Sequence, residues 1–119
     1  MKFIYIILFT LLLTSCFESN NWRDVKAIKS SGKIRVLTRN SSTSFYKDKS
    51  GEIAGFEHDL TQEFAKHLGV EVEYVIKSSL NELFKALLNG EGDLIASSLT
   101  STPSRRQRFR LSPSYHKIV

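Results

Sequence analysis

Strand-like and helix-like hydrophobic patterns alternate along this chain. An apolar, β-branched run at 34–38 is followed by helical spacing at 57–68, alternation at 70–76, helical spacing at 80–88 and a short apolar run at 93–96. Parallel strands need a crossover connection between them, and that crossover is usually a helix. The β-α-β-α-β order therefore predicts an α/β fold in which helices cover an open, mainly parallel sheet.

Two longer helices should supply most of the cover for this sheet. Leu60, Phe64 and Leu68 recur at helical spacing with Ala65 beside them, so we expect this side of the 57–68 helix to face the core. Ser79 and Glu82 have the spacing of a capping box and predict the start of the next helix. We expect that helix to bury Leu80, Leu83, Phe84, Leu87 and Leu88.

Shorter elements fill the rest of the predicted domain. Asn21 is expected to cap a first helix that has Asp24 in its first turn and ends at Gly32. Residues 45–56 predict a hairpin around Ser50-Gly51. Thr102-Pro103 indicates a last helix, with threonine as its cap and proline at its first position.

An apolar run near the N-terminus predicts an export signal rather than a membrane span. The run covers 3–13 and is broken only by Thr10. As a helix it reaches about 17 Å, whereas the hydrocarbon core of a membrane is about 30 Å thick. Cys16, the only cysteine, follows Leu13-Thr14-Ser15 in a pattern that resembles the lipobox of bacterial lipoproteins. We therefore expect a lipoprotein signal peptide at 1–15, lipidation of Cys16 and a polar tether at 16–21.

An incidental or buried cysteine behind an ordinary signal peptide is the alternative interpretation. An unpaired thiol is a liability in an oxidising compartment, and this favours lipidation. The expected location is the cell envelope, with the protein held at a membrane through Cys16 as a periplasmic lipoprotein. Phe17 in place of Asp after the cysteine favours the outer membrane.

Polar residues follow the first and third predicted strands. In parallel sheets, ligands bind beyond the carboxyl ends of the strands, so these two segments should meet at one site. Hydroxyls, free backbone N–H groups and an arginine at a helix start suit a carboxylate ligand. The alternative is that the same residues only solvate loops and cap a helix. The candidate ligand-binding residues are Arg39, Asn40, Ser42, Ser97, Ser98, Thr100 and Arg105.

Charge and residue types exclude several other functions. The net charge is +5, and residues 101–119 hold five Lys and Arg but no Asp or Glu. Behind an export signal this basic run does not indicate a nucleic-acid partner. His58, His67 and His116 lack metal-ligand spacing, so we expect neither a metal nor a cofactor. Glu57 and the other carboxylates of its helix are explained by the helix's first turn and outer face, and no catalytic residue is expected.

Three segments resemble the bacterial extracellular solute-binding proteins of family 3. They are Gly55–Leu60, Gly92–Ala96 and Ser97–Arg106, and the resemblance covers roughly 32–115. It implies a type II periplasmic binding protein-like fold, of which residues 22–119 would be a truncated first lobe. The positions of Ser97, Ser98 and Thr100 would bind an amino acid's α-amino and α-carboxylate groups, and Arg105 would clamp the carboxylate. Ser42 stands where that family often has an aromatic residue, which argues against an ordinary free-amino-acid specificity.

A narrower resemblance leads to the membrane-bound lytic transglycosylases of peptidoglycan. It rests on Arg35–Tyr46 together with 55–60 and 64–70, although Ser42 stands where those proteins often have proline. It implies a regulatory domain that takes muropeptide-like ligands and so has peptidoglycan as a partner. The glutamate of a Glu-Ser motif in a helical domain, which such an enzyme needs, is not found here. Two hypotheses follow: a lipid-anchored, non-catalytic solute-binding domain, or the N-terminal regulatory fragment of a lytic transglycosylase.

Overall fold

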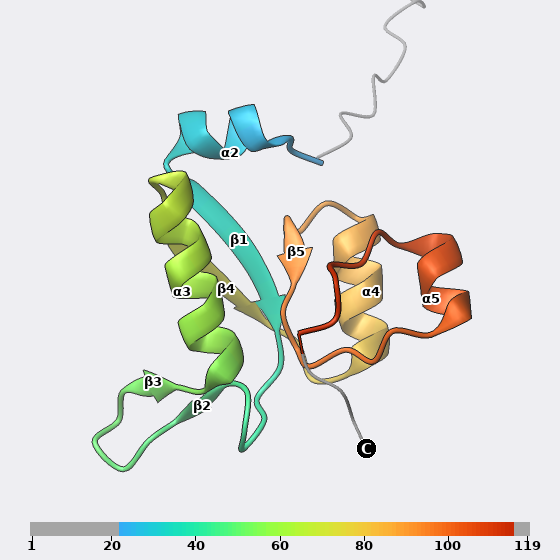
Figure 1. Cartoon of the computed structure of the whole chain (residues 1–119). Coiled ribbons are helices and arrows are strands. Elements are labelled where there is room, and N and C mark those ends of the chain that lie inside the picture. The colour runs from blue at the N-terminus through green and yellow to red at the C-terminus, as the bar shows by residue number, and fades with distance from the viewer. Residues whose placement is uncertain (1–21, 116–119) are drawn as a thin grey trace, which may run out of the picture.

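The computed structural model describes residues 22–115 as a three-stranded sheet with helices on both faces, plus a small hairpin (Figure 1). In chain order the elements are α2 (Val25–Ser31), β1 (Lys33–Thr38), β2 (Tyr46–Lys47), β3 (Ile53–Ala54), α3 (Phe56–Leu68), β4 (Glu71–Ile76), α4 (Leu80–Leu88), β5 (Leu94–Ile95) and α5 (Pro103–Arg108). The expected signal peptide at 1–15, the lipidated Cys16 and the tether at 16–21 lie outside the described residues.

The sheet is parallel and has the strand order β4-β1-β5. β1 pairs with β4 from Lys33 opposite Glu71 to Thr38 opposite Ile76. On its other side, β1 pairs with β5 at Val36 and Leu37. The expectation of an open parallel sheet is confirmed, and all three strands end at the same edge. The β2–β3 hairpin lies at that edge, beside the start of α3 (Figure 1).

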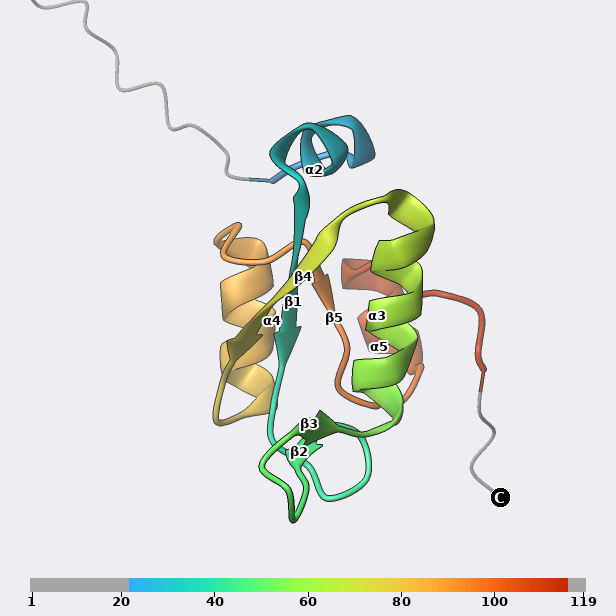
Figure 2. The ribbon, with the colours of Figure 1, turned by 90° about the vertical axis from the view of Figure 1, so that its left-hand side faces the viewer.

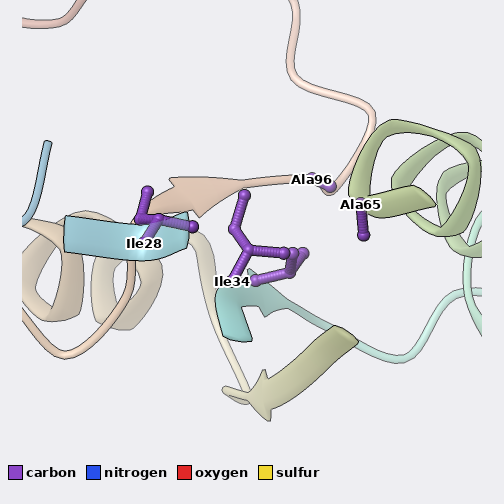
Figure 3. Packing of buried hydrophobic residues seen from close by; sticks show 5 residues of the cluster. Ile28, Ile34, Ala65 and Ala96 are labelled. Atoms are coloured by element: carbon purple, nitrogen blue, oxygen red, sulfur yellow. The ribbon is translucent and has the colours of Figure 1, made fainter. Parts of the chain in front are cut away.

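Two small hydrophobic clusters lie on opposite faces of the central strand. Ile34 and Val36 point to one face and pack with Ile28 of α2 and Ala65 of α3 (Figure 3). Leu37 points to the other face and packs against α4. Figure 2 shows α3 and α4 on opposite sides of the sheet. Because strand side chains alternate, one short strand fills both clusters.

The buried side of α3 is only partly the expected one: Leu68 and Ala65 pack in the core as predicted, but Leu60 and Phe64 do not. Leu60 and Phe64 are 42% and 44% exposed, whereas Glu57, Thr61 and Ala65 are buried. The Thr61 hydroxyl lies 2.9 Å from the Tyr74 hydroxyl of β4, and small side chains on this side let α3 pack close to the sheet. Packing of small residues and a buried polar contact therefore outweigh the apolar stripe.

α4 follows its prediction more closely. Glu82 donates its backbone N–H to the Ser79 hydroxyl at 3.2 Å, as a capping box requires. The Glu82 carboxylate, however, accepts from Ser78 rather than from Ser79. Leu83 is fully buried, but Leu88 is 46% exposed and its predicted burial is wrong. Ala86 takes the inward position after Leu83, which places Leu88 on the outer side.

The first helix begins later than expected. Its N-cap is Asp24, whose carboxylate accepts from the Ala27 N–H at 2.8 Å, so Asp24 precedes the first turn instead of lying in it. Asn21 lies outside the described residues. The predicted end at Gly32 is confirmed, with a left-handed φ of 71°. Thr102 caps α5 and Pro103 is its first residue, also as predicted.

Two side chains attach the first described residues to the rest of the domain. The Trp22 indole donates to the carbonyls of Leu87 and Leu88, at 3.2 and 3.1 Å, at the end of α4. Arg23 pairs with Asp93, just before β5. Within residues 22–115, no helix has the length and apolar character needed to span a membrane.

Candidate functional site

The candidate site lies where β1 and β5 end. The Thr38 hydroxyl at the end of β1 donates to the Ala96 carbonyl after β5 at 2.6 Å. One residue further on, the Arg39 guanidinium donates to the Ser97 hydroxyl at 3.4 Å. The two polar segments therefore meet at the carboxyl edge, as the sequence predicts. We call residues 97–100 the ligand loop, because the sequence predicts ligand contact for them.

Arg105 is held beside this loop by two contacts. Its guanidinium donates to the Thr100 carbonyl at 2.8 Å. Its central carbon also lies 5.6 Å from the centre of the Phe84 ring of α4, a cation–π contact. The Thr102 cap fixes the start of α5 by accepting from the Arg105 N–H. The guanidinium is therefore placed at the carboxyl edge with the ligand loop on one side and an aromatic face on the other.

Asn40 and Ser42 are the two candidate residues without a contact to the rest of the candidate site among those found in residues 22–115. Ser42 is exposed in a turn that is closed by backbone bonds between Ser41 and Phe45. Asn40 and Arg39 line a shallow cavity of about 270 Å³ next to Ile76. Among the contacts found in residues 22–115, none joins Asn40 or Ser42 to the ligand loop or to Arg105.

Glu57 is a site residue that the sequence does not predict. Instead of lying on the outer side of α3, it is only 2% exposed. Its carboxylate oxygen Oε1 accepts from the Ser98 backbone N–H at 2.6 Å and from the Ser98 hydroxyl at 3.2 Å. A detectable signal was present: Thr61 and Ala65 mark an inner side of α3 that also contains Glu57.

Gly55 brings Glu57 to this position. A Cβ at Gly55 would lie 2.4 Å from the Ser44 carbonyl oxygen, and its φ of 125° is a conformation that suits glycine. The close approach lets the Glu57 N–H donate to the Ser44 carbonyl at 2.9 Å. These contacts fix the start of α3 against the loop after β1. This position places the Glu57 side chain next to the ligand loop.

The described residues hold no metal-binding cluster. Residues 22–115 contain no group of three or more His, Cys, Asp or Glu side chains that could hold a metal ion. His58 Nδ1 lies 3.0 Å from the Asp59 carboxylate, and its ring packs near those of Phe45 and Tyr74. Besides the buried Glu57 carboxylate, which takes both Ser98 donors, the edge offers other hydroxyls and backbone N–H groups and two guanidinium groups, which suit recognition of an anionic group.

Fold and edge together define a lobe of a periplasmic solute-binding protein. In solved structures, the arginine-bound form of domain 1 of TmArgBP from T. maritima is 36% identical and has a TM-score of 0.61, with 67% of this chain and 64% of that chain covered. An ancestral cationic amino acid solute-binding protein is also 36% identical, with a TM-score of 0.64, and 70% of this chain and 36% of that chain are covered.

The family model for bacterial extracellular solute-binding proteins, family 3, matches residues 34–119, and the chain belongs to this family. Curated relatives carry a narrower name, membrane-bound lytic murein transglycosylase F. The one from Pseudoalteromonas translucida is 41% identical over 117 residues, which are 98% of this chain and 25% of the relative. The one from Vibrio vulnificus is 38% identical over 118 residues, 98% of this chain and 22% of the relative. The chain thus spans about a quarter of the length of these relatives.

Proposed function

We propose that this chain is a non-catalytic solute-binding domain that takes a ligand with a free carboxylate, either an amino acid or a muropeptide-like molecule. The observation that carries the proposal is the convergence of the ligand loop, Arg39 and Arg105 at the carboxyl edge. In it, the guanidinium of Arg105 clamps the carboxylate, and Ser97 and Thr100 supply hydroxyls and N–H groups. The Ser98 N–H and hydroxyl donate to Glu57, so Ser98 takes part through its hydroxyl oxygen, which can accept from an amino group of the ligand. Arg39, Asn40 and Ser42 complete the proposed site on the β1 side.

Binding by a single lobe has a precedent among the similar solved structures. One of them is the arginine-bound form of domain 1 from TmArgBP. This supports the proposal that one lobe with a carboxyl edge can hold a ligand without a second lobe closing over it. L-arginine is therefore the first probe, and a soluble muropeptide with a free carboxylate is the second.

The test is calorimetric titration of the purified chain with both probes. Arg105→Ala should weaken binding at least about tenfold, because a charge-assisted hydrogen bond is lost. Arg106→Ala is the matched control, since Arg106 is an exposed neighbour on the same helix and no part of the proposed site. Equal affinity of Arg105→Ala and the unchanged chain for every probe that binds would remove Arg105 from the site.

We further propose that the chain is anchored in the cell envelope through Cys16 and that the domain proper covers 22–119. The support is the lipobox-like Leu13–Cys16 pattern and the name "membrane-bound" carried by the curated relatives. In cells, Cys16→Ala should abolish incorporation of labelled fatty acid and move the protein from the membrane to the soluble fraction. Ser19→Ala is the control and should keep the label. Fractionation of inner and outer membranes tests the proposed outer-membrane location.

A second candidate function is regulation of a peptidoglycan lytic transglycosylase, and the similarity to proteins of that name favours it. In this case peptidoglycan is the partner, and the chain carries the sensing domain rather than the chemistry. The chain incubated with peptidoglycan should release no anhydro-ended fragments. Release of such fragments would contradict the proposal that it is non-catalytic.

A further inference from the structure

One buried carboxylate oxygen joins three distant parts of the chain. Glu57 Oε1, at the start of α3, accepts both hydrogen bonds from Ser98 in the ligand loop. The same oxygen accepts from the Tyr115 hydroxyl at 2.8 Å. A carboxylate is costly to bury unless hydrogen bonds compensate for lost water, and here three donors converge on one atom.

The bonds to Ser98 hold an unusual backbone conformation. Ser98 has a φ of 50°, the only positive φ at a residue other than glycine among the described residues. This left-handed region is sparsely populated by residues with a Cβ, and neighbouring contacts must stabilise it. Because Glu57 binds both the N–H and the hydroxyl of Ser98, it fixes how the ligand loop turns between Ser97 and Thr100.

Tyr115 connects this carboxylate to the segment that follows α5. Its ring lies 5.5 Å from the ring of Phe56, the residue before Glu57. Tyr115 is 54% exposed, and its partial burial together with the hydrogen bond to Glu57 raises its pKa to about 12, so the hydroxyl keeps its proton and donates. Residues 112–115 are therefore attached to α3 at the same atom that shapes the ligand loop.

We propose that Glu57 is a positioning residue that sets the ligand loop and couples it to Tyr115. This role rests on the proposed solute-binding function. If Glu57 couples the two residues, a ligand that engages Ser98 should also change the environment of Tyr115. Conversely, loss of the Tyr115 hydroxyl should weaken ligand binding, because the conformation of the ligand loop changes. Glu57 itself does not touch the ligand in this proposal.

The first arm of the test needs no ligand. In amide NMR spectra of the full chain, the Ser98 amide proton should lie downfield, because it donates to a carboxylate at short distance. Glu57→Gln and Tyr115→Phe should each shift that resonance. Glu63→Gln, an exposed carboxylate of the same helix, is the control and should not. In a Glu57→Ala background, Tyr115→Phe should produce no further shift, because the link between the two residues is gone.

The second arm measures L-arginine and muropeptide affinity of the same variants. Glu57→Gln should bind about tenfold more weakly than the unchanged chain, and Tyr115→Phe several-fold more weakly. If Tyr115→Phe leaves the Ser98 amide resonance unshifted, the coupling is contradicted. If Glu57→Gln leaves the ligand affinity unchanged, the positioning role is contradicted. Failure of the unchanged chain to bind either probe would contradict the proposed function instead, while the resonance shifts still decide the link through Glu57.

Discussion

At the scale of single residues, Asp93 organises the amino end of the sheet. Its carboxylate accepts from the Arg23 Nε at 3.1 Å, from the Arg35 guanidinium at 2.9 Å and from the Arg35 backbone N–H at 2.7 Å. The Asp93 side chain is 1% exposed, while both arginine side chains are 22% exposed. One buried charge therefore ties the entering chain, β1 and the start of β5 together.

Asp93→Asn should lower the free energy of unfolding by about 2–3 kcal/mol, because two guanidinium groups lose their buried partner but regain some water. Urea denaturation measures this loss. Asp59→Asn, an exposed carboxylate of α3, is the control and should change stability by less than about 0.5 kcal/mol. A loss from Asp93→Asn no larger than that of the control would show that the network contributes no stability.

Acid should destabilise the fold by protonating the Asp93 carboxylate. Burial raises the pKa of Asp93, but hydrogen bonds from Arg23 and Arg35 outweigh it and hold this pKa below its usual value. A carboxylate with a lowered pKa in the folded state stabilises the fold above its unfolded pKa of about 3.9 and loses that contribution as pH falls. Stability measured from pH 7 down to pH 2 should therefore fall below about pH 4, and the acid-dependent loss should be smaller in Asp93→Asn. Parallel curves for the two proteins would contradict this.

At the scale of elements, α3 and α4 each have an inner side that packs against the sheet. In α4 that side contains Leu83 and Ala86, and in α3 it contains Thr61 and Ala65. The apolar residues on the outer sides, Leu60, Phe64 and Leu88, are 42%, 44% and 46% exposed. Apolar side chains outside the core are common on protein surfaces, so exposure alone assigns them no role.

Paired substitutions in α4 test this assignment. Leu83→Ala should cost about 3 kcal/mol of unfolding free energy, because it leaves a cavity between Leu37 and the helix. Leu88→Ala should cost less than about 1 kcal/mol, since the side chain is already half in water. Thermal or urea unfolding of both variants distinguishes them. Equal costs would mean that α4 packs with another side toward the sheet.

The elements could be predicted from sequence better than their orientation could. Periodicity and caps locate β1, α3, α4 and the start of α5, because these signals are local. They fail at Glu57, whose burial depends on the close approach allowed by Gly55 and on donors 41 and 58 residues away. They also fail to show that Asp93 is a buried ion-pair centre, because both of its partners come from distant positions in the chain.

At the scale of the whole molecule, the parallel sheet collects the chemistry at one edge. The sequence predicts that the segments after β1 and β5 meet, and the Arg39–Ser97 and Thr38–Ala96 contacts confirm it. It does not predict which residues of those segments turn toward each other, because that depends on the turn after Asn40 and on the Ser98 conformation. The other end of the sheet contains the Asp93 network and the point where the chain enters the domain (Figure 1). Ligand contact is therefore proposed at the end of the sheet opposite the one to which Arg23 is tied.

The most direct measurement compares a ligand with the counterpart in which its carboxylate is replaced by a neutral amide. L-arginine and L-argininamide differ only in the α-carboxylate, which the proposed site recognises through Arg105 and the ligand loop. If L-arginine is the probe that binds, calorimetric titration of the chain should give at least about tenfold weaker binding to the amide, because a charge-assisted hydrogen bond is lost. If the muropeptide is the ligand that binds, its carboxyl-amidated form should show the same loss. Equal affinity for the acid and the amide would contradict a carboxylate-binding site at this edge of the sheet.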